Sequence, residues 1–154
     1  LMIAMKSGFM FGWAKPVPVD FSRLRNPRRD MAIVAIAGPA ANLLMAIFWA
    51  LVARASGLLP DDSPYLDPLL LLSIIGILFN AMLALVNMVP VPPLDGGRLL
   101  VGLLPYHLAD KLARLEPYGF FILLGLMFTG ILGLFLGLPM HLLRGLLMGI
   151  AGVS

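Results

Sequence analysis

Asn87-Met-Val-Pro-Val-Pro-Pro-Leu-Asp-Gly-Gly-Arg98 follows a long apolar run and interrupts the membrane-like pattern of the chain. Its prolines, Pro90, Pro92 and Pro93, lack backbone donors and end a helix. Asp95 then places a carboxylate at or near membrane depth, which costs about 3 kcal/mol or more unless the carboxylate has a partner. Irregular backbone and an acid are tolerated at that depth where they line a protein-walled or water-filled cavity. We therefore predict that this stretch forms the functional site.

The composition indicates a polytopic membrane protein. Of the 154 residues, 60% are hydrophobic and only 12% are charged, which is too apolar for an ordinary soluble domain. The formal net charge is +3, but the basic residues flank apolar runs. They are not interleaved with aromatic or polar side chains that could contact bases, which argues against nucleic-acid binding. The chain has no cysteine, so disulfides and thiolate metal sites are excluded.

The apolar runs predict an all-α polytopic membrane protein with a single membrane domain, 1–154. About 20 residues of helix cross the hydrocarbon core of a bilayer. An N-terminal extended or interfacial segment and a short C-terminal interfacial helix complete the prediction, because alternate prolines forbid a helix near the start and the last apolar stretch is short. The predicted segments are an extended segment at 9–30, transmembrane helices at 31–53, 69–91 and 119–138, and an interfacial helix within Met140–Val153.

Charge asymmetry predicts the orientation in the membrane. Four arginines between residues 23 and 29 precede the first span, and such basic clusters mark the cytoplasmic side. We therefore expect 6–30 and the loop 98–118 to be cytoplasmic, and the acidic loop Arg54–Pro68 to lie on the outer side. The expected location is a cell membrane.

Asp95 is the strongest candidate for chemistry. Its carboxylate could bind a metal ion or a proton inside the membrane, or it could simply cap a helix or pair with Arg98. A catalytic zinc commonly takes two histidines and one acid. The only histidines, His107 and His141, have no Glu or second His at helical spacing, so neither is expected to be a metal ligand.

Two motifs resemble the site-2 protease family of intramembrane zinc metalloproteases. Asn87-x-x-Pro90-x-x-x-Leu94-Asp95-Gly96 is similar to the family's Asn-x-x-Pro-x-x-x-Leu-Asp-Gly motif. Gly38-x-x-x-Asn42 is similar to a weaker motif on the preceding span, and the segments 12–19 and 24–30 look like the part that precedes that span in short bacterial members. The resemblance covers about Phe9 to Leu138.

The resemblance implies a role for each matching residue. Asp95 would be the third zinc ligand, and zinc would polarise the peptide carbonyl and activate water. Asn87, and Asn42 with Gly38, would line the substrate cleft. The stretch containing Lys15 and Val17 would pair as a strand with an unwound segment of a transmembrane protein substrate, because a peptide bond must leave its helix before water can attack it.

One departure from the family is large. The family carries a His-Glu-x-x-His motif on an earlier helix, and these 154 residues contain none. We expect the chain to be a C-terminal portion, with Leu1–Met5 as the tail of an earlier segment, and to be inactive by itself. Two alternatives stay open: an inactive relative that binds membrane helices without cleaving them, and a small transporter-like subunit that uses Asp95 as an ion site.

Overall fold

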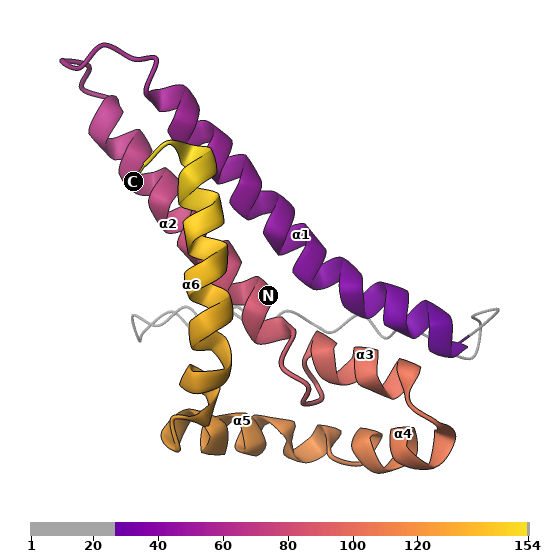
Figure 1. Ribbon diagram of the computed structural model, residues 1–154. Helices are drawn as coiled ribbons and strands as arrows, with labels where there is room; N and C mark the ends of the chain where they lie inside the picture. Colours follow the sequence, from indigo (N-terminus) through magenta and orange to yellow (C-terminus); the bar gives the residue numbers. More distant parts are fainter. Residues whose placement is uncertain (1–26, 154) are drawn as a thin grey trace, which may run out of the picture.

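The computed structural model describes residues 27–153, and all the regular secondary structure in that range is helical. The two longest helices, α1 and α2, run antiparallel, and α6 crosses them (Figure 1). The shorter helices α3, α4 and α5 run across one end of this bundle. In chain order the elements are α1 (Pro27–Ser56), α2 (Leu66–Asn87), α3 (Asp95–Leu103), α4 (Tyr106–Ala113), the 3-10 turn η2 (Glu116–Tyr118), α5 (Gly119–Phe128) and α6 (Ile131–Ala151).

Three of these helices are long and apolar enough to cross a bilayer. They are Arg29–Ser56, Leu66–Asn87 and Ile131–Ala151, with mean hydropathies of 2.1, 2.7 and 1.7. Most of their large apolar side chains are exposed on the surface of the bundle, as expected where lipid is the solvent. The prediction of an all-α integral membrane protein with three spans is confirmed.

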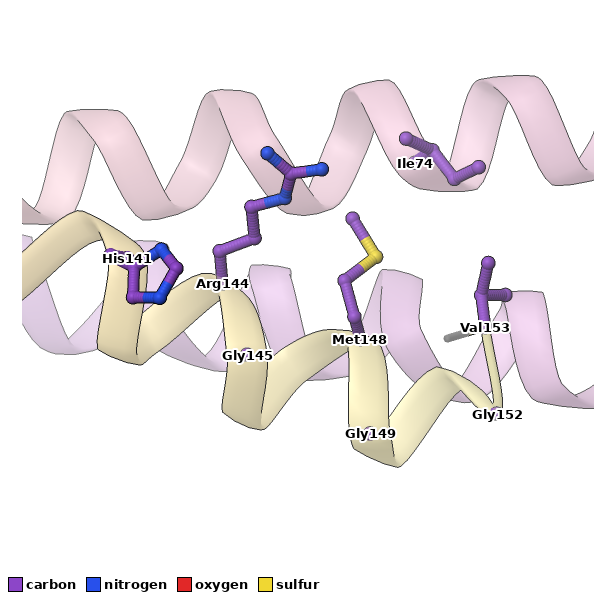
Figure 2. A pocket seen from close by; sticks show the side chains of 8 residues that line it. All are labelled: Ile74, His141, Arg144, Gly145, Met148, Gly149, Gly152 and Val153. Carbon is purple, nitrogen blue, oxygen red and sulfur yellow. The ribbon is translucent and has the colours of Figure 1, made fainter.

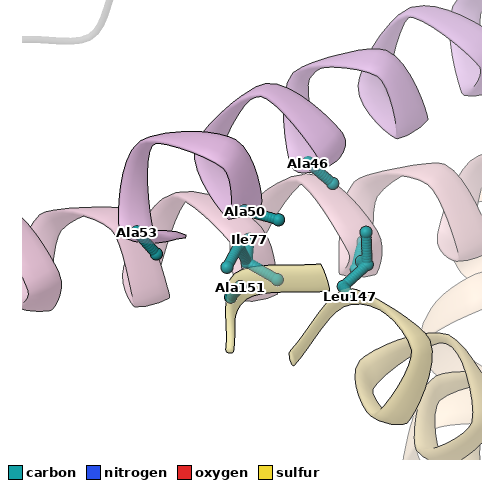
Figure 3. Packing of buried hydrophobic residues seen from close by; sticks show 7 residues of the cluster. Ala46, Ala50, Ala53, Ile77, Leu147 and Ala151 are labelled. Atoms are coloured by element: carbon teal, nitrogen blue, oxygen red, sulfur yellow. The ribbon is translucent and has the colours of Figure 1, made fainter. Parts of the chain in front are cut away.

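Small side chains bring the three long helices together. The buried residues of α1 recur at spacings of three, four or seven positions, so they form one stripe along the helix. Since lipid tails are as apolar as leucine, helices associate in a membrane through close packing, which alanine permits. Figure 3 shows this seam, formed by Ala46, Ala50 and Ala53 of α1, Ile77 and Ala81 of α2, and Leu147 and Ala151 of α6.

The third span differs from its predicted bounds. The segment 119–138 is not one helix, because α5 ends at Phe128 and Gly130 adopts a left-handed conformation with φ of 74°. α6 then continues through Pro139 to Ala151, so it also includes the stretch predicted as a separate interfacial helix. The proline is tolerated inside the helix, whereas the glycine turns the chain.

Other boundaries shift more modestly. α1 begins at Pro27, so the last residues of the predicted extended segment 9–30 are helical. α2 ends at Asn87, four residues before the predicted end of its span. The predicted loop 98–118 is largely helical, because it contains most of α3, all of α4 and η2. The rest of the predicted extended segment, 9–26, lies outside the described residues.

The alanine seam predicts a position-specific loss of stability. Ala50 is fully buried where α1 meets α2 and α6, so Ala50→Leu should lower the free energy of unfolding by about 1–3 kcal/mol through overpacking. Ala41→Leu is the matched control, because Ala41 is exposed on the same helix. Unfolding in mixed micelles, followed by far-UV circular dichroism, measures both changes. Equal losses in the two variants would contradict this packing.

Candidate functional site

The turn after α2 satisfies its own backbone donors. Every non-proline N–H between Met88 and Leu94 donates to a backbone carbonyl: Met88 to Leu85 at 3.1 Å, Val89 to Val86 at 3.0 Å, Val91 to Val89 at 2.8 Å, and Leu94 to Val91 at 3.0 Å. The remaining positions are prolines, which have no donor. Irregular backbone therefore persists at the end of a membrane helix without an unpaired N–H group.

Two glycines allow α3 to pack directly under this turn. Both Gly96 and Gly97 are buried in the first turn of α3. A β-carbon on Gly96 would overlap the carbonyl group of Met88, and one on Gly97 would overlap the backbone around Pro92. The backbone of α3 thus touches the backbone of the turn, a close approach that requires glycine. This contact fixes where α3 begins and therefore where Asp95, its first residue, lies.

Asp95 meets α1 at Gly38. A β-carbon on Gly38 would overlap Oδ2 of Asp95 and would lie 3.3 Å from its Cγ. The carboxylate is half-buried, and the Asp95 side chain takes part in no hydrogen bond with any residue of 27–153. Two positions that are 57 residues apart in sequence, and that belong to the two motifs, are therefore in contact.

Asp95 neither caps α3 nor forms an ion pair with Arg98, the two structural alternatives for its carboxylate. The N-cap of α3 is Leu94, and no side-chain hydrogen bond caps the helix. Arg98 forms its ion pair with Glu116, with 3.1 Å between Nη2 and Oε1. Burial raises the pKa of Asp95, and the nearby positive charge of Arg98 opposes that shift. The carboxylate is thus held in place by packing and keeps its oxygens free.

A second segment supports the turn from behind. Glu116 binds Arg98 on α3, and Gly119, three residues later, packs against Pro92 and Pro93. A β-carbon on Gly119 would overlap the carbonyl oxygen of Pro92. The segment 116–119 therefore contacts both the turn and α3. The sequence analysis did not find this contact, because no local pattern relates Glu116 to Arg98, 18 residues earlier, or Gly119 to Pro92, 27 residues earlier.

The other predicted site residues are less closely tied to Asp95. Asn42 is half-buried on α1 one turn after Gly38, and Asn87 is the half-buried last residue of α2. Within the described residues neither asparagine hydrogen-bonds to Asp95. Lys15 and Val17 lie outside the described range. The structure therefore brings together Gly38 and Asp95, while the cleft-lining roles of the other four residues stay predictions.

The described residues do not complete a zinc site. Among residues 27–153 no three His, Cys, Asp or Glu side chains come together to hold a metal ion. His107 is exposed on α4, and His141 is exposed on α6. Asp95 offers a free carboxylate, which suits one ligand position, but a catalytic zinc needs about three protein ligands. This part of the chain alone does not fit the metal.

The contact between Gly38 and Asp95 can be tested by a disulfide. Since the chain has no cysteine, Gly38→Cys combined with Asp95→Cys gives one pair of thiols. A sulfur in place of Asp95 Cγ would lie 3.3 Å from the new β-carbon. That distance is close to the roughly 3 Å between a sulfur and its partner's β-carbon in a disulfide. After mild oxidation, most molecules should have both thiols in the disulfide and should therefore not react with a maleimide mass tag.

The matched control for this pair moves one thiol around α1. Ala40→Cys with Asp95→Cys places the first thiol two residues on, and residues at that spacing do not share a helix face. This control pair should stay fully labelled. Efficient cross-linking of the control, or none in the Gly38 pair, would show that Asp95 does not face Gly38.

The support behind the turn predicts opposite effects at two glycines of α5. Gly119→Ala should lower the free energy of unfolding by about 1–3 kcal/mol, because its β-carbon would displace the turn at Pro92. Gly125→Ala should be neutral or should stabilise by up to about 1 kcal/mol, since nothing lies within 4 Å of its added β-carbon. Denaturation in micelles measures both, and a neutral Gly119→Ala would contradict the packing.

A bacterial protein is similar in sequence to most of this chain. The chain is 39% identical over 124 residues to the Bacillus subtilis (strain 168) protein named "Putative zinc metalloprotease YwhC". The match covers 77% of this chain and 55% of the relative, so the chain spans about half the length of that protein. No protein-family profile matches the chain, and no solved structure matches it. The chain is thus similar to a bacterial protein named as a zinc metalloprotease.

Proposed function

We propose that this chain forms one wall of the active site of an intramembrane zinc metalloprotease of the site-2 protease type, with Asp95 as a metal ligand. The observation that carries this proposal is the half-buried Asp95 carboxylate, which faces Gly38 and has no hydrogen-bond partner among residues 27–153. A carboxylate without a structural partner is expected to have a functional one. The similarity to the Bacillus subtilis protein supports the choice of zinc and of peptide hydrolysis.

The remaining metal ligands would come from outside these residues. The sequence contains no His-Glu-x-x-His, and its two histidines lie on α4 and α6. We therefore propose that the complete site includes two histidines and a general base that the 154 residues do not supply. The chain alone would neither retain catalytic zinc nor hydrolyse peptides.

The substrate would be a membrane-spanning protein segment. Asp95, the first residue of α3, lies against Gly38 of α1, and α3 packs against the turn 88–94. An extended peptide placed there would meet the Asp95 carboxylate close to irregular backbone. Asn42 and Asn87 would line this cleft from α1 and α2. The Lys15–Val19 segment would add a strand to the unwound substrate, which would satisfy its freed backbone groups. We place 6–30 and 98–118 on the cytoplasmic side.

The proposal predicts that Asp95→Ala abolishes both zinc retention and cleavage. In the complete gene product containing this chain, purified in detergent, zinc per polypeptide should fall from near one toward zero. Cleavage of a reporter transmembrane segment should fall by at least about 100-fold, because a lost ligand affects activity at least as strongly as a lost outer-shell contact. Elemental analysis and gel-based cleavage measure the two effects.

Asp61→Ala is the matched control, because Asp61 is exposed in the loop between α1 and α2. This variant should keep wild-type zinc and activity. Cleavage that survives Asp95→Ala would contradict the proposal. The transporter-like alternative would be supported instead if the wild-type protein bound no zinc and conducted ions, and if Asp95→Asn abolished that ion flux.

A further inference from the structure

A groove between α2 and α6 carries two polar side chains that the proposed protease site does not use. It has a volume of about 810 Å³ and extends along α6 from His141 to Val153, with Ile74 of α2 on the opposite wall. Figure 2 shows His141, Arg144 and Met148 projecting from α6 on the side of α2. Ligand sites in proteins commonly have volumes in this range.

Arg144 is a cation inside a membrane-spanning helix. α6 has 21 residues and so measures about 31 Å, close to the thickness of the hydrocarbon core. Arg144 is seven residues from the last residue of α6, so its Cα lies about 10 Å below that end. Within residues 27–153 neither Arg144 nor His141 forms an ion pair or a hydrogen bond. A charge at this depth is stabilised by an anionic partner or by extension of its charged end toward the interface.

The arginine side chain extends toward the nearer membrane surface. In Figure 2 its guanidinium lies between the Cα positions of Arg144 and Met148, on the way to Gly152 and Val153 at the end of α6. Arginine near the end of a membrane helix commonly extends in this way to reach the headgroup region. The groove therefore leads from the guanidinium to the membrane surface.

We propose that this groove binds the phosphate of an anionic phospholipid through Arg144. A guanidinium presents paired N–H groups that match two phosphate oxygens. The apolar walls at Ile74 and Met148 would pack against the start of an acyl chain. Phosphatidylglycerol is the representative ligand, since it combines a phosphodiester with a net negative charge. This inference does not depend on the protease proposal.

A lipid fits the groove better than an acidic transmembrane helix does. A helix partner would have to place its own carboxylate about 10 Å inside the hydrocarbon core, which costs as much as the arginine does. A phospholipid already carries its phosphate at the membrane surface, toward which the groove opens. Binding it requires only that the arginine extend to meet the headgroup.

Native mass spectrometry with competing lipids tests this inference. The full polypeptide, delipidated and mixed with equal amounts of phosphatidylglycerol and phosphatidylcholine, should bind about tenfold more of the former. Both lipids carry a phosphodiester, but the choline ammonium of phosphatidylcholine offsets the phosphate charge and would be repelled by the guanidinium. Arg144→Leu should reduce this ratio to about one, while Arg144→Lys should keep part of it because lysine still binds phosphate as a point charge. Lys111→Leu, which removes one charge from α4, is the matched control and should keep the full ratio.

Two further measurements make the result decisive. If Arg144→Leu loses its far-UV helicity, Arg144→Gln, which keeps a polar but uncharged side chain, replaces it. An unchanged lipid ratio in a folded Arg144 variant overturns the proposal. The proposal is also overturned if the wild-type protein binds the two lipids equally and a photoreactive side chain at position 149 captures protein and no lipid. That result would indicate an acidic helix as the occupant of the groove.

Discussion

The contact between the Asp95 carboxylate and Gly38 constrains the rest of the described structure. It joins the start of α3 to the middle of α1, and it exists only because α1 has no side chain at that position. Any other residue there would place a β-carbon on the carboxylate oxygen. Gly38 of one motif and Asp95 of the other are therefore needed together for this contact. The two motifs are for this reason a more specific signal as a pair than either is alone.

Several contacts hold Asp95 in this position without bonding to it. The turn after α2 uses its own carbonyls to satisfy its own donors, so it keeps its shape at a helix end where water is scarce. Gly97 presses α3 against that turn, while Gly119 packs against its outer side. Glu116 pairs with Arg98, so the cation whose charge acts on the carboxylate is already engaged. The result is a fixed backbone and an acid whose oxygens are free.

The sequence predicted the features that depend on local chemistry. Apolar runs predicted helices long enough to span a bilayer, and the triple proline predicted the end of α2 and the irregular turn. It could not predict features decided by distant contacts or by one backbone conformation. The predicted span 119–138 ran through Gly130 and ended just before Pro139, whereas in the structure the glycine turns the chain and the proline stays inside α6.

The same limit explains the segment 98–118. Its mixture of charged residues and prolines is typical of a loop, yet α4 and η2 form there and bring Glu116 to Arg98. The spacing between Asp95 and Arg98 allowed a pair within one helix turn as an alternative, because residues three apart share a face. A more distant acid forms that pair, and this has a chemical consequence. An Asp95 bonded to Arg98 would have its charge neutralised, whereas an Arg98 bonded to Glu116 leaves the Asp95 oxygens open to a cation from elsewhere.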